Sequence, residues 1–222
     1  MNALVIGATG ATGKYLVEHL LKDSDFTEVH IFVRKAVVIS HPKLKIHLVD
    51  FDKIQNWKEK IIGDVAFSTM GTTLKQAGSK EAQRVVDYNY QYNFAKYAKE
   101  NHVPHFVLLS SYGADPKSMF FYSKIKGELE VAVQQLNFEY LTVFRPGILE
   151  RKNSDRPMEI ISSKVLKFLI NLGLFTSQKP MPTEILAKAM VNSSKIKTKK
   201  ISSVILDEIF EMAKNETSLN QL

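Results

Sequence analysis

The sequence predicts an α/β fold, a doubly wound parallel sheet with helices on both faces. Residues 3–6 form an apolar run of strand formers that leads directly into a glycine-rich turn and a helical pattern. Apolar runs of strand length then alternate with amphipathic helical segments as far as residue 145. The 222 residues are 45% hydrophobic and 24% charged, which is typical of a globular chain and is most simply explained by one domain, 1–222.

The opening turn carries glycine at positions 7, 10 and 13. Gly7 allows a sharp turn off the strand, Gly10 allows the backbone to approach a pyrophosphate, and Gly13 allows the helix to pack closely. The following helix presents free N–H groups and a partial positive charge at its N-terminus. This pattern is typical of a dinucleotide-binding βαβ unit, and it predicts cofactor contacts from Gly7, Thr9, Gly10, Ala11, Thr12 and Gly13.

The second predicted strand, residues 28–35, ends in Arg34 and Lys35. Folds of this kind that prefer NAD place an acidic residue near this point, where it binds the ribose 2′-hydroxyl. Two cations favour a 2′-phosphate instead, because a guanidinium binds phosphate through two hydrogen bonds. We therefore expect NADP(H), the alternative being a strand that simply ends in solvated basic side chains.

The third and fourth predicted strands are residues 45–50 and 65–68. Asp50, at the end of the third strand and followed by Phe51, is placed to meet an adenine ring, although it could equally cap the next turn. A short helical piece is expected at 57–61. Small and hydroxyl-bearing residues at the end of the fourth strand predict a surface that faces the cofactor, made of Ser68, Thr69, Met70 and Gly71.

Two long helices and two strands are expected next. The helix over 80–101 carries an aromatic stripe that fits either the core or a dimer interface, and the strand 105–109 ends in two serines. A helix over 122–136 precedes the strand 140–144. We expect the residues that close this strand to reach the cofactor: Arg145, Pro146 and Gly147. Strands and helices in this rhythm indicate a Rossmann-type sheet.

The last part of the chain has a looser pattern. Residues 147–182, with an apolar helix at 165–174, are expected to form a small substrate lid. A helix beginning at Pro182, a strand at 201–205 and a helix at 207–214 should follow. The polar end, 215–222, is expected to fray.

Composition excludes several kinds of site. Cysteine is absent, so there is no disulfide, thiolate metal site or cysteine nucleophile, and the six histidines show no metal-site spacing. No apolar stretch approaches a membrane span, and the chain begins directly in a predicted strand, so a cytoplasmic location is expected. The net charge of +7 includes a cluster at Lys195, Lys197, Lys199 and Lys200. We interpret the charge as a solvated lysine-rich surface, with a phosphorylated cofactor taking part of it, because no nucleic-acid motif is present.

Tyr122 and Lys126 form a Tyr-x-x-x-Lys pair, one turn apart on one helix face. Tyr92 and Lys96 form a second copy, so context must distinguish them. Only Tyr122 follows a strand that ends in a serine pair. Hydride transfer to a carbonyl needs a proton donor, and a tyrosine can act if an ammonium lowers its pKa. A serine hydroxyl can orient the substrate oxygen, for which Ser111 is the first choice and Ser110 the alternative.

The glycine turn, the serine pair, Tyr122 with Lys126, and residues 145–147 together resemble the short-chain dehydrogenase/reductase superfamily. Segments 68–73, 77–79 and 126–130 make the chain similar to its atypical, short members. The resemblance implies a Rossmann fold, NADP(H) binding at the glycines and Arg34, and a Ser111, Tyr122 and Lys126 catalytic set. It also suggests Asn89 as the helix asparagine of the superfamily. The Asn-Asn-Ala-Gly motif of typical members is replaced by Ser-Thr-Met-Gly, so their substrates do not transfer.

The leading function hypothesis is an NADP(H)-dependent oxidoreductase that transfers hydride between the nicotinamide and a small carbonyl or alcohol. The main rival is a non-catalytic NADP(H)-binding redox sensor that acts through a regulatory protein partner. A nucleotide-sugar epimerase is disfavoured, because the region after Gly147 is short for enclosing such a substrate. The same fold hosts all three, so the site must decide. Neither a metal ion nor a membrane is expected to take part, and a homodimer is compatible with the aromatic helix.

Overall fold

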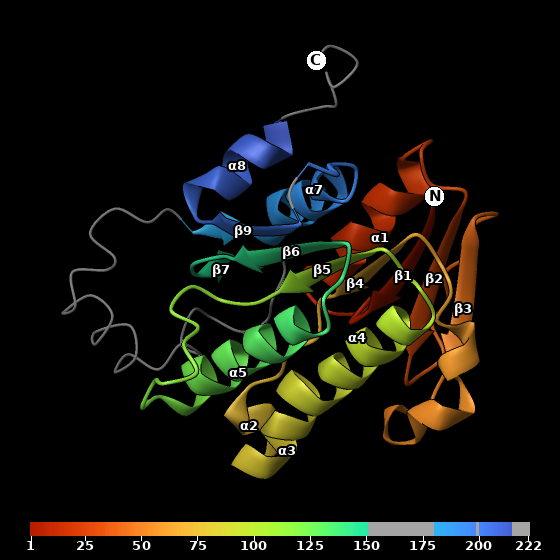
Figure 1. The fold of residues 1–222 in the computed structure, drawn as a ribbon. Coiled ribbons are helices and arrows are strands. Elements are labelled where there is room, and N and C mark those ends of the chain that lie inside the picture. Colours follow the sequence, from red (N-terminus) through yellow and green to blue (C-terminus); the bar gives the residue numbers. More distant parts are fainter. Residues whose placement is uncertain (151–179, 199, 215–222) are drawn as a thin grey trace.

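A computed structural model describes residues 1–150, 180–198 and 200–214. Its main sheet has seven strands in the order β3-β2-β1-β4-β5-β6-β9, and every neighbouring pair is parallel (Figure 1). This confirms the predicted doubly wound sheet. The strands are β1 (Asn2–Ile6), β2 (Glu28–Val33), β3 (Leu44–Leu48), β4 (Val65–Ser68), β5 (His105–Leu109), β6 (Tyr140–Arg145) and β9 (Ile201–Ile205).

The direction of winding reverses between β1 and β4. From β1 the chain goes outward through β2 to β3, then returns to place β4 on the other side of β1. Val5 of β1 accordingly lies opposite Ile31 on one side and Phe67 on the other. Because all seven strands are parallel, their carboxyl ends share one edge, and a ligand crevice is expected at this reversal.

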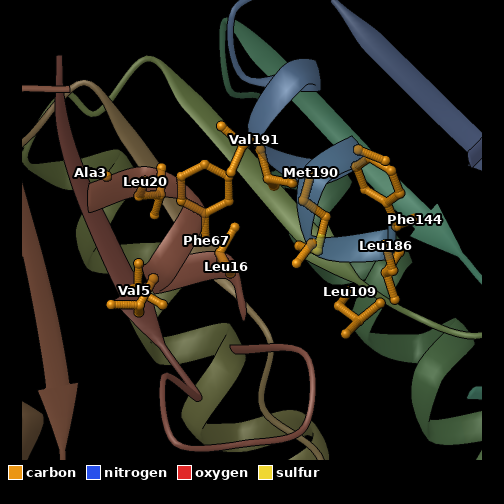
Figure 2. Packing of buried hydrophobic residues seen from close by; sticks show 14 of the residues in the cluster. Ala3, Val5, Leu16, Leu20, Phe67, Leu109, Phe144, Leu186, Met190 and Val191 are labelled. Carbon is orange, nitrogen blue, oxygen red and sulfur yellow. The ribbon is translucent and has the colours of Figure 1, made fainter. Parts of the chain in front are cut away.

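One face of the sheet is covered by α1 (Gly13–Lys22), α7 (Thr183–Ser193) and α8 (Asp207–Lys214) (Figure 1). The apolar stripe of α1 and that of α7 pack against the inward side chains of β1, β4, β5 and β6. Figure 2 shows this cluster, with labelled residues Ala3, Val5, Leu16, Leu20, Phe67, Leu109, Phe144, Leu186, Met190 and Val191. Burial of these side chains fixes how the N-terminus of α1 lies over the end of β1.

The opposite face is covered by α4 (Tyr90–Glu100) and α5 (Phe121–Gln135) (Figure 1). Alternate residues of the same strands point to this side, as strand geometry requires. Phe94 of α4 packs between Phe32 and Phe106, with ring centroids 5.8 and 6.2 Å apart. Leu129 and Val133 of α5 belong to the same buried cluster, so both helices pack on this face of the sheet.

The helix expected over 80–101 is interrupted in the structure. It consists of α3 (Lys80–Arg84), a π-helical segment η3 (Val85–Asn89) and α4. A π-helical turn inserts one extra residue and is frequent at functional sites. Here it turns the polar residues Asp87 and Gln91 into the interior, where both are fully buried.

Several short elements of the structure were not predicted, and one predicted element has different bounds. The helical piece expected at 57–61 consists of two 3₁₀ helices, η1 (Phe51–Asn56) and η2 (Lys58–Lys60). The short helix α2 (Leu74–Ala77) follows β4. A two-stranded parallel pairing of β7 (Leu149–Glu150) with β8 (Met181–Pro182) joins the two ends of the predicted lid. Most of that lid, including the helix expected at 165–174, lies outside the described residues, as does the end expected to fray at 215–222.

Candidate functional site

The glycine turn needs glycine for measurable reasons. Gly7 has a φ of +80°, which L side chains rarely adopt, and a Cβ there would lie 2.6 Å from the Met70 nitrogen. A Cβ on Gly13 would lie 2.0 Å from the Gly7 carbonyl oxygen. Gly10 differs, because it is exposed and its nearest neighbour would be the Gly7 oxygen at 3.2 Å. Gly7 and Gly13 are therefore required by the fold, whereas the backbone of Gly10 is accessible to a ligand.

The N-terminus of α1 fits a phosphate group. Its first turn contains no acidic side chain, so the positive end of the helix dipole is not neutralised locally. Thr9 and Gly10 are exposed beside it, while Ala11 is half-buried and Thr12 is buried. These residues offer backbone amides and little bulk, which is the arrangement that a nucleotide pyrophosphate requires.

At the end of β4, two of the predicted cofactor residues use their side chains internally. The Thr69 hydroxyl donates to the Ile6 carbonyl at 3.0 Å, and the Ser68 hydroxyl donates to Gln91 Oε1 at 2.8 Å. Met70 is buried and Gly71 is exposed. This strand end is thus bonded to β1 and to the start of α4, and Gly71 is the position whose backbone is exposed.

At the ends of β2 and β3, Arg34 and Lys35 are both exposed, directly after the last residue of β2. The carboxylate of Asp50 accepts a hydrogen bond from the Asp52 amide at 3.0 Å and so caps η1, the alternative left open by the sequence. Phe51 is buried and packs on Tyr90, with ring centroids 5.4 Å apart. The side chains of Arg34 and Lys35 are therefore open to solvent, whereas Asp50 and Phe51 also stabilise the fold.

Tyr90 lies on this side of the site as well. Its hydroxyl donates to Asp52 Oδ1 at 2.6 Å. Burial, together with that carboxylate, raises the pKa of Tyr90 to about 12, and the nearby Arg34 opposes the shift. The Tyr90 hydroxyl therefore stays neutral, and Arg34 lies within electrostatic range of Tyr90.

The serine pair follows β5 at the same edge of the sheet. The Ser110 amide donates to the Phe144 carbonyl at 2.8 Å, and the Tyr112 amide donates to the Pro146 carbonyl at 2.9 Å. The loop after β5 is thus tied to the loop after β6, in which Pro146 is buried and Gly147 half-buried. Both serine hydroxyls, on Ser110 and Ser111, are buried without a hydrogen-bond partner among the described residues. Geometry does not separate the two serines, and both remain candidates.

Tyr122 and Lys126 lie on the first two turns of α5. Tyr122 is 43% exposed, whereas Lys126 is only 2% exposed. The Lys126 ammonium donates to the Leu109 carbonyl at 3.2 Å, which anchors it to the end of β5 beside the serine pair. Burial lowers the pKa of Lys126, and the carboxylates of Asp87 and Glu130 oppose that shift.

A close contact sets the distance between α5 and the loop that follows β5. A Cβ on Gly127 would lie 2.3 Å from the backbone of Asp115, so only glycine allows the loop to cross here. The Asp115 amide donates to the Ser123 carbonyl at 3.1 Å. The loop and the first turn of α5 therefore form one rigid corner around the candidate catalytic residues.

Arg145 was expected to reach the cofactor, but its side chain binds another residue of the fold. Its guanidinium binds both carboxylate oxygens of Glu130 on α5, with Nε at 3.1 Å from each and a further bond from Nη2. The Glu130 side chain is 8% exposed and that of Arg145 is 33% exposed. The Arg145 side chain thus holds α5 to the end of β6, which leaves its backbone as the part open to a cofactor.

Sequence reasoning missed Asp87 and Gln91. Both are fully buried polar residues that face the candidate site from the π-helical segment and the start of α4. The available signal was their polarity within an aromatic stripe, but a straight helix would not have turned both inward. Asn89, suggested as the helix asparagine, is exposed.

Within the described part of the chain, no group of three or more histidine, aspartate or glutamate residues could hold a metal ion. The helices of this part include none that is long and apolar enough to cross a membrane.

Comparison with known proteins identifies the family. A family model described as NAD(P)H-binding matches residues 7–167, which is most of the chain and includes the glycine turn and the Tyr122 corner. The chain belongs to the NAD(P)H-binding family. Membership supports a nicotinamide cofactor.

Two curated relatives extend the comparison. Protein HTATIP2 of Rattus norvegicus is 35% identical over 198 residues, covering 86% of this chain and 80% of its own length. Protein FMP52, mitochondrial, of Candida albicans is 34% identical over 161 residues, covering 69% of this chain and 70% of its own length. These relatives confirm the resemblance to atypical members of the short-chain dehydrogenase/reductase superfamily.

The relatives also correct one prediction. FMP52 of Candida albicans and that of Saccharomyces cerevisiae are both named mitochondrial. The prediction of a purely cytoplasmic location is therefore wrong. It relied on a chain that begins directly in a strand, and the position of the first strand does not determine the compartment.

Among solved structures, MoeE5 in complex with UDP-glucose and NAD matches with a TM-score of 0.71 at 14% identity. The match covers 96% of this chain and 81% of that one. At this identity the likeness concerns the fold alone. It confirms the Rossmann-type architecture.

Proposed function

We propose that the protein is an NADP(H)-dependent oxidoreductase that interconverts a small carbonyl and the corresponding alcohol. The observation that carries the proposal is the arrangement of Lys126 and Tyr122. The buried Lys126 ammonium lies one helical turn from the partly exposed Tyr122. Two buried serine hydroxyls lie beside it at the edge of the sheet. These are the groups that hydride transfer to a carbonyl needs around its oxygen.

Each residue has a defined part in this proposal. The bound nicotinamide supplies or accepts the hydride. The Tyr122 phenol gives its proton to the oxygen of the carbonyl in reduction and takes it back in oxidation. The Lys126 ammonium stabilises the phenolate form. One of the two serines, Ser111 first, donates a hydrogen bond that orients the substrate oxygen.

The choice of NADP(H) rests on Arg34 and Lys35. Both are exposed at the end of β2, and no residue of that strand end supplies the carboxylate that would bind a free ribose hydroxyl. A guanidinium and an ammonium there favour a 2′-phosphate. The family model supports a nicotinamide cofactor but does not distinguish the two forms.

The test compares two tyrosine variants. Tyr122→Phe removes the proposed proton donor, and Tyr92→Phe removes the tyrosine of the second Tyr-x-x-x-Lys copy, which stacks on Tyr88 at 5.8 Å. NADPH affinity is measured by calorimetric titration, and NADPH oxidation is followed with a panel of aldehydes, ketones and quinones. Tyr122→Phe should lose at least about 100-fold in turnover with nearly unchanged NADPH affinity, while Tyr92→Phe should retain both.

Two results would overturn the proposal. Equal turnover in wild type and Tyr122→Phe would remove Tyr122 as the donor. Tight NADPH binding by wild type with no oxidation of the cofactor by any carbonyl would instead favour the non-catalytic redox sensor.

A further inference from the structure

Asp87 is a buried carboxylate that the proposed chemistry does not yet use. It lies in the π-helical segment η3 and its side chain is fully buried. Asp87 Oδ1 accepts a hydrogen bond from the Thr72 amide at 3.2 Å, and a Cβ on Gly71 would lie 3.4 Å from the same oxygen. Oδ2 has no hydrogen-bond partner among the described residues. A buried carboxylate oxygen without a donor is costly and calls for a reason.

The backbone of Asp87 is held from a second side. Gln91 Nε2 donates to the Asp87 carbonyl at 3.0 Å, and Gln91 Oε1 accepts from the Ser68 hydroxyl at 2.8 Å. This chain of bonds connects the end of β4 to the π-helical segment. Since Thr72 belongs to the loop after β4, Asp87 is fixed to that loop through both its main chain and its side chain.

The π-helical segment η3 packs against α5, which places the buried Asp87 and the buried Lys126 on neighbouring elements, and each charge acts on the pKa of the other. Burial raises the pKa of Asp87, and the charge of Lys126, the Thr72 amide and the Gln83 side chain oppose that shift. Burial lowers the pKa of Lys126, and Asp87 and Glu130 oppose that shift. The part of the chain that the structure describes contains no ion pair of Asp87 within 4.0 Å, so the two groups interact through space without direct contact.

The other charged and titratable groups around Lys126 leave Asp87 as its counter-charge. Glu130, one turn further along α5, is already bound by Arg145 from β6 through two carboxylate oxygens. Tyr122 lies one turn earlier on α5, and the Leu109 carbonyl at the end of β5 accepts a hydrogen bond from the Lys126 ammonium. An ammonium buried this deeply needs a compensating negative charge to stay ionised.

We propose that Asp87 is a positioning residue, which holds the buried Lys126 in its protonated form and fixes it relative to the loop after β4. This inference rests on the proposed function, in which the Lys126 ammonium stabilises the Tyr122 phenolate. Loss of the Asp87 charge would lower the pKa of Lys126 further. The Lys126 ammonium would then be less able to stabilise the Tyr122 phenolate.

The direct test follows the lysine itself by NMR. Protein labelled with ¹³C at lysine Cε gives one signal per lysine, and Lys126→Met identifies the signal of Lys126 by its loss. In Asp87→Asn, which keeps the size and the acceptor for Thr72, the titration midpoint of Lys126 should fall by at least about one pH unit. Glu100→Gln, an exposed carboxylate change on α4, should leave it in place. An unchanged midpoint in Asp87→Asn overturns the proposal.

A reciprocal measurement covers the case in which Asp87→Asn fails to fold. Because interaction between two titrating groups is mutual, replacing Lys126 with Met must raise the midpoint of the Asp87 carboxyl, followed through its ¹³Cγ signal. No rise would also overturn the proposal. These titrations need no cofactor. Failure of the wild type to bind NADPH would therefore refute the proposed function, while the interaction between Asp87 and Lys126 would still be tested by the titrations alone.

Discussion

Gly13 of α1 lies so close to the turn before it that a Cβ would stand 2.0 Å from the Gly7 carbonyl oxygen. This contact brings the helix N-terminus to the end of β1, the edge of the sheet at which a ligand crevice is expected. The fold and the phosphate site therefore depend on one close approach, and the glycines of the turn can be separated by experiment.

Gly13→Ala should lower the free energy of unfolding by about 3 kcal/mol, because a methyl group cannot be placed without moving α1 or the turn. Gly10→Ala should cost only about 1 kcal/mol, since its nearest neighbour would be at 3.2 Å. Urea unfolding measures both. Equal losses in the two variants would contradict the separation of roles.

Gly10→Ala should instead weaken NADPH binding by at least about tenfold, because its open backbone is the surface offered to the pyrophosphate. Calorimetric titration of the folded variant with NADPH measures this. Gly78→Ala is a control outside the crevice for the effect of adding a methyl group, although its φ of +86° makes some loss of stability expected. If Gly10→Ala binds NADPH like wild type, the turn does not hold the phosphates.

Arg34→Ala should weaken NADPH binding by about 10- to 100-fold and leave NADH binding nearly unchanged, since only NADPH carries the 2′-phosphate. Lys35→Ala should show the same preference at smaller size, because an ammonium does not form the paired bonds of a guanidinium. Parallel titrations with the two cofactors measure the ratio. Equal losses for both cofactors would refute the assignment of Arg34.

Arg145→Met should destabilise the fold by about 2 kcal/mol, because it leaves the buried Glu130 carboxylate without its cation. Arg84 and Glu128 form a more exposed pair at 2.5 Å, with side chains 42% and 26% exposed. Arg84→Met should therefore cost less than about 1 kcal/mol. Denaturant unfolding of both variants tests the contrast, and the double variant of Arg145→Met with Glu130→Gln should recover part of the loss.

The fold should lose stability in acid partly through His105. This residue is 1% exposed, its Nε2 lies 3.0 Å from the Thr142 hydroxyl, and burial lowers its pKa to about 4. The unfolded chain binds a proton at higher pH than the folded one, so this contribution is present above pH 6.5 and is lost as the pH falls toward 4. The loss amounts to about 3 kcal/mol.

His105→Gln isolates that contribution. Unfolding free energies at pH 7.5 and pH 4.5 should differ less in the variant than in wild type, whereas His102→Gln, at an exposed position, should behave like wild type. If the pH dependence of His105→Gln matches that of wild type, other groups carry the acid sensitivity.

The sequence predicted the order of the main elements because local patterns determine them. The run of β-branched and apolar residues before Gly7, the glycines themselves and the alternation of strands and helices all act within a few residues. The same holds for Tyr122 and Lys126, whose spacing places them on one helix face. These predictions needed no knowledge of which strands are neighbours.

The π-helical segment shows where local patterns fail. The aromatic stripe over 80–101 predicts one regular helix, yet the chain inserts an extra residue at 85–89. The insertion turns Asp87 and Gln91 inward, where they bond to the loop after β4 and to Ser68. Those partners lie 15 and 23 residues away, so the sequence around Asp87 carries no sign of them.

By itself, the sequence determined the parallel α/β sheet, the glycine turn and the residue types of the site, since propensity, periodicity and glycine geometry are local properties. Tertiary structure decided which polar groups come together: Arg145 bound to Glu130 rather than left open, Asp50 capping η1, and the buried Asp87 on an element packed against the helix of Lys126. The physical reason is that electrostatic pairing and burial depend on distances through space. Those distances exist only once β4, β5, β6 and α5 have packed together.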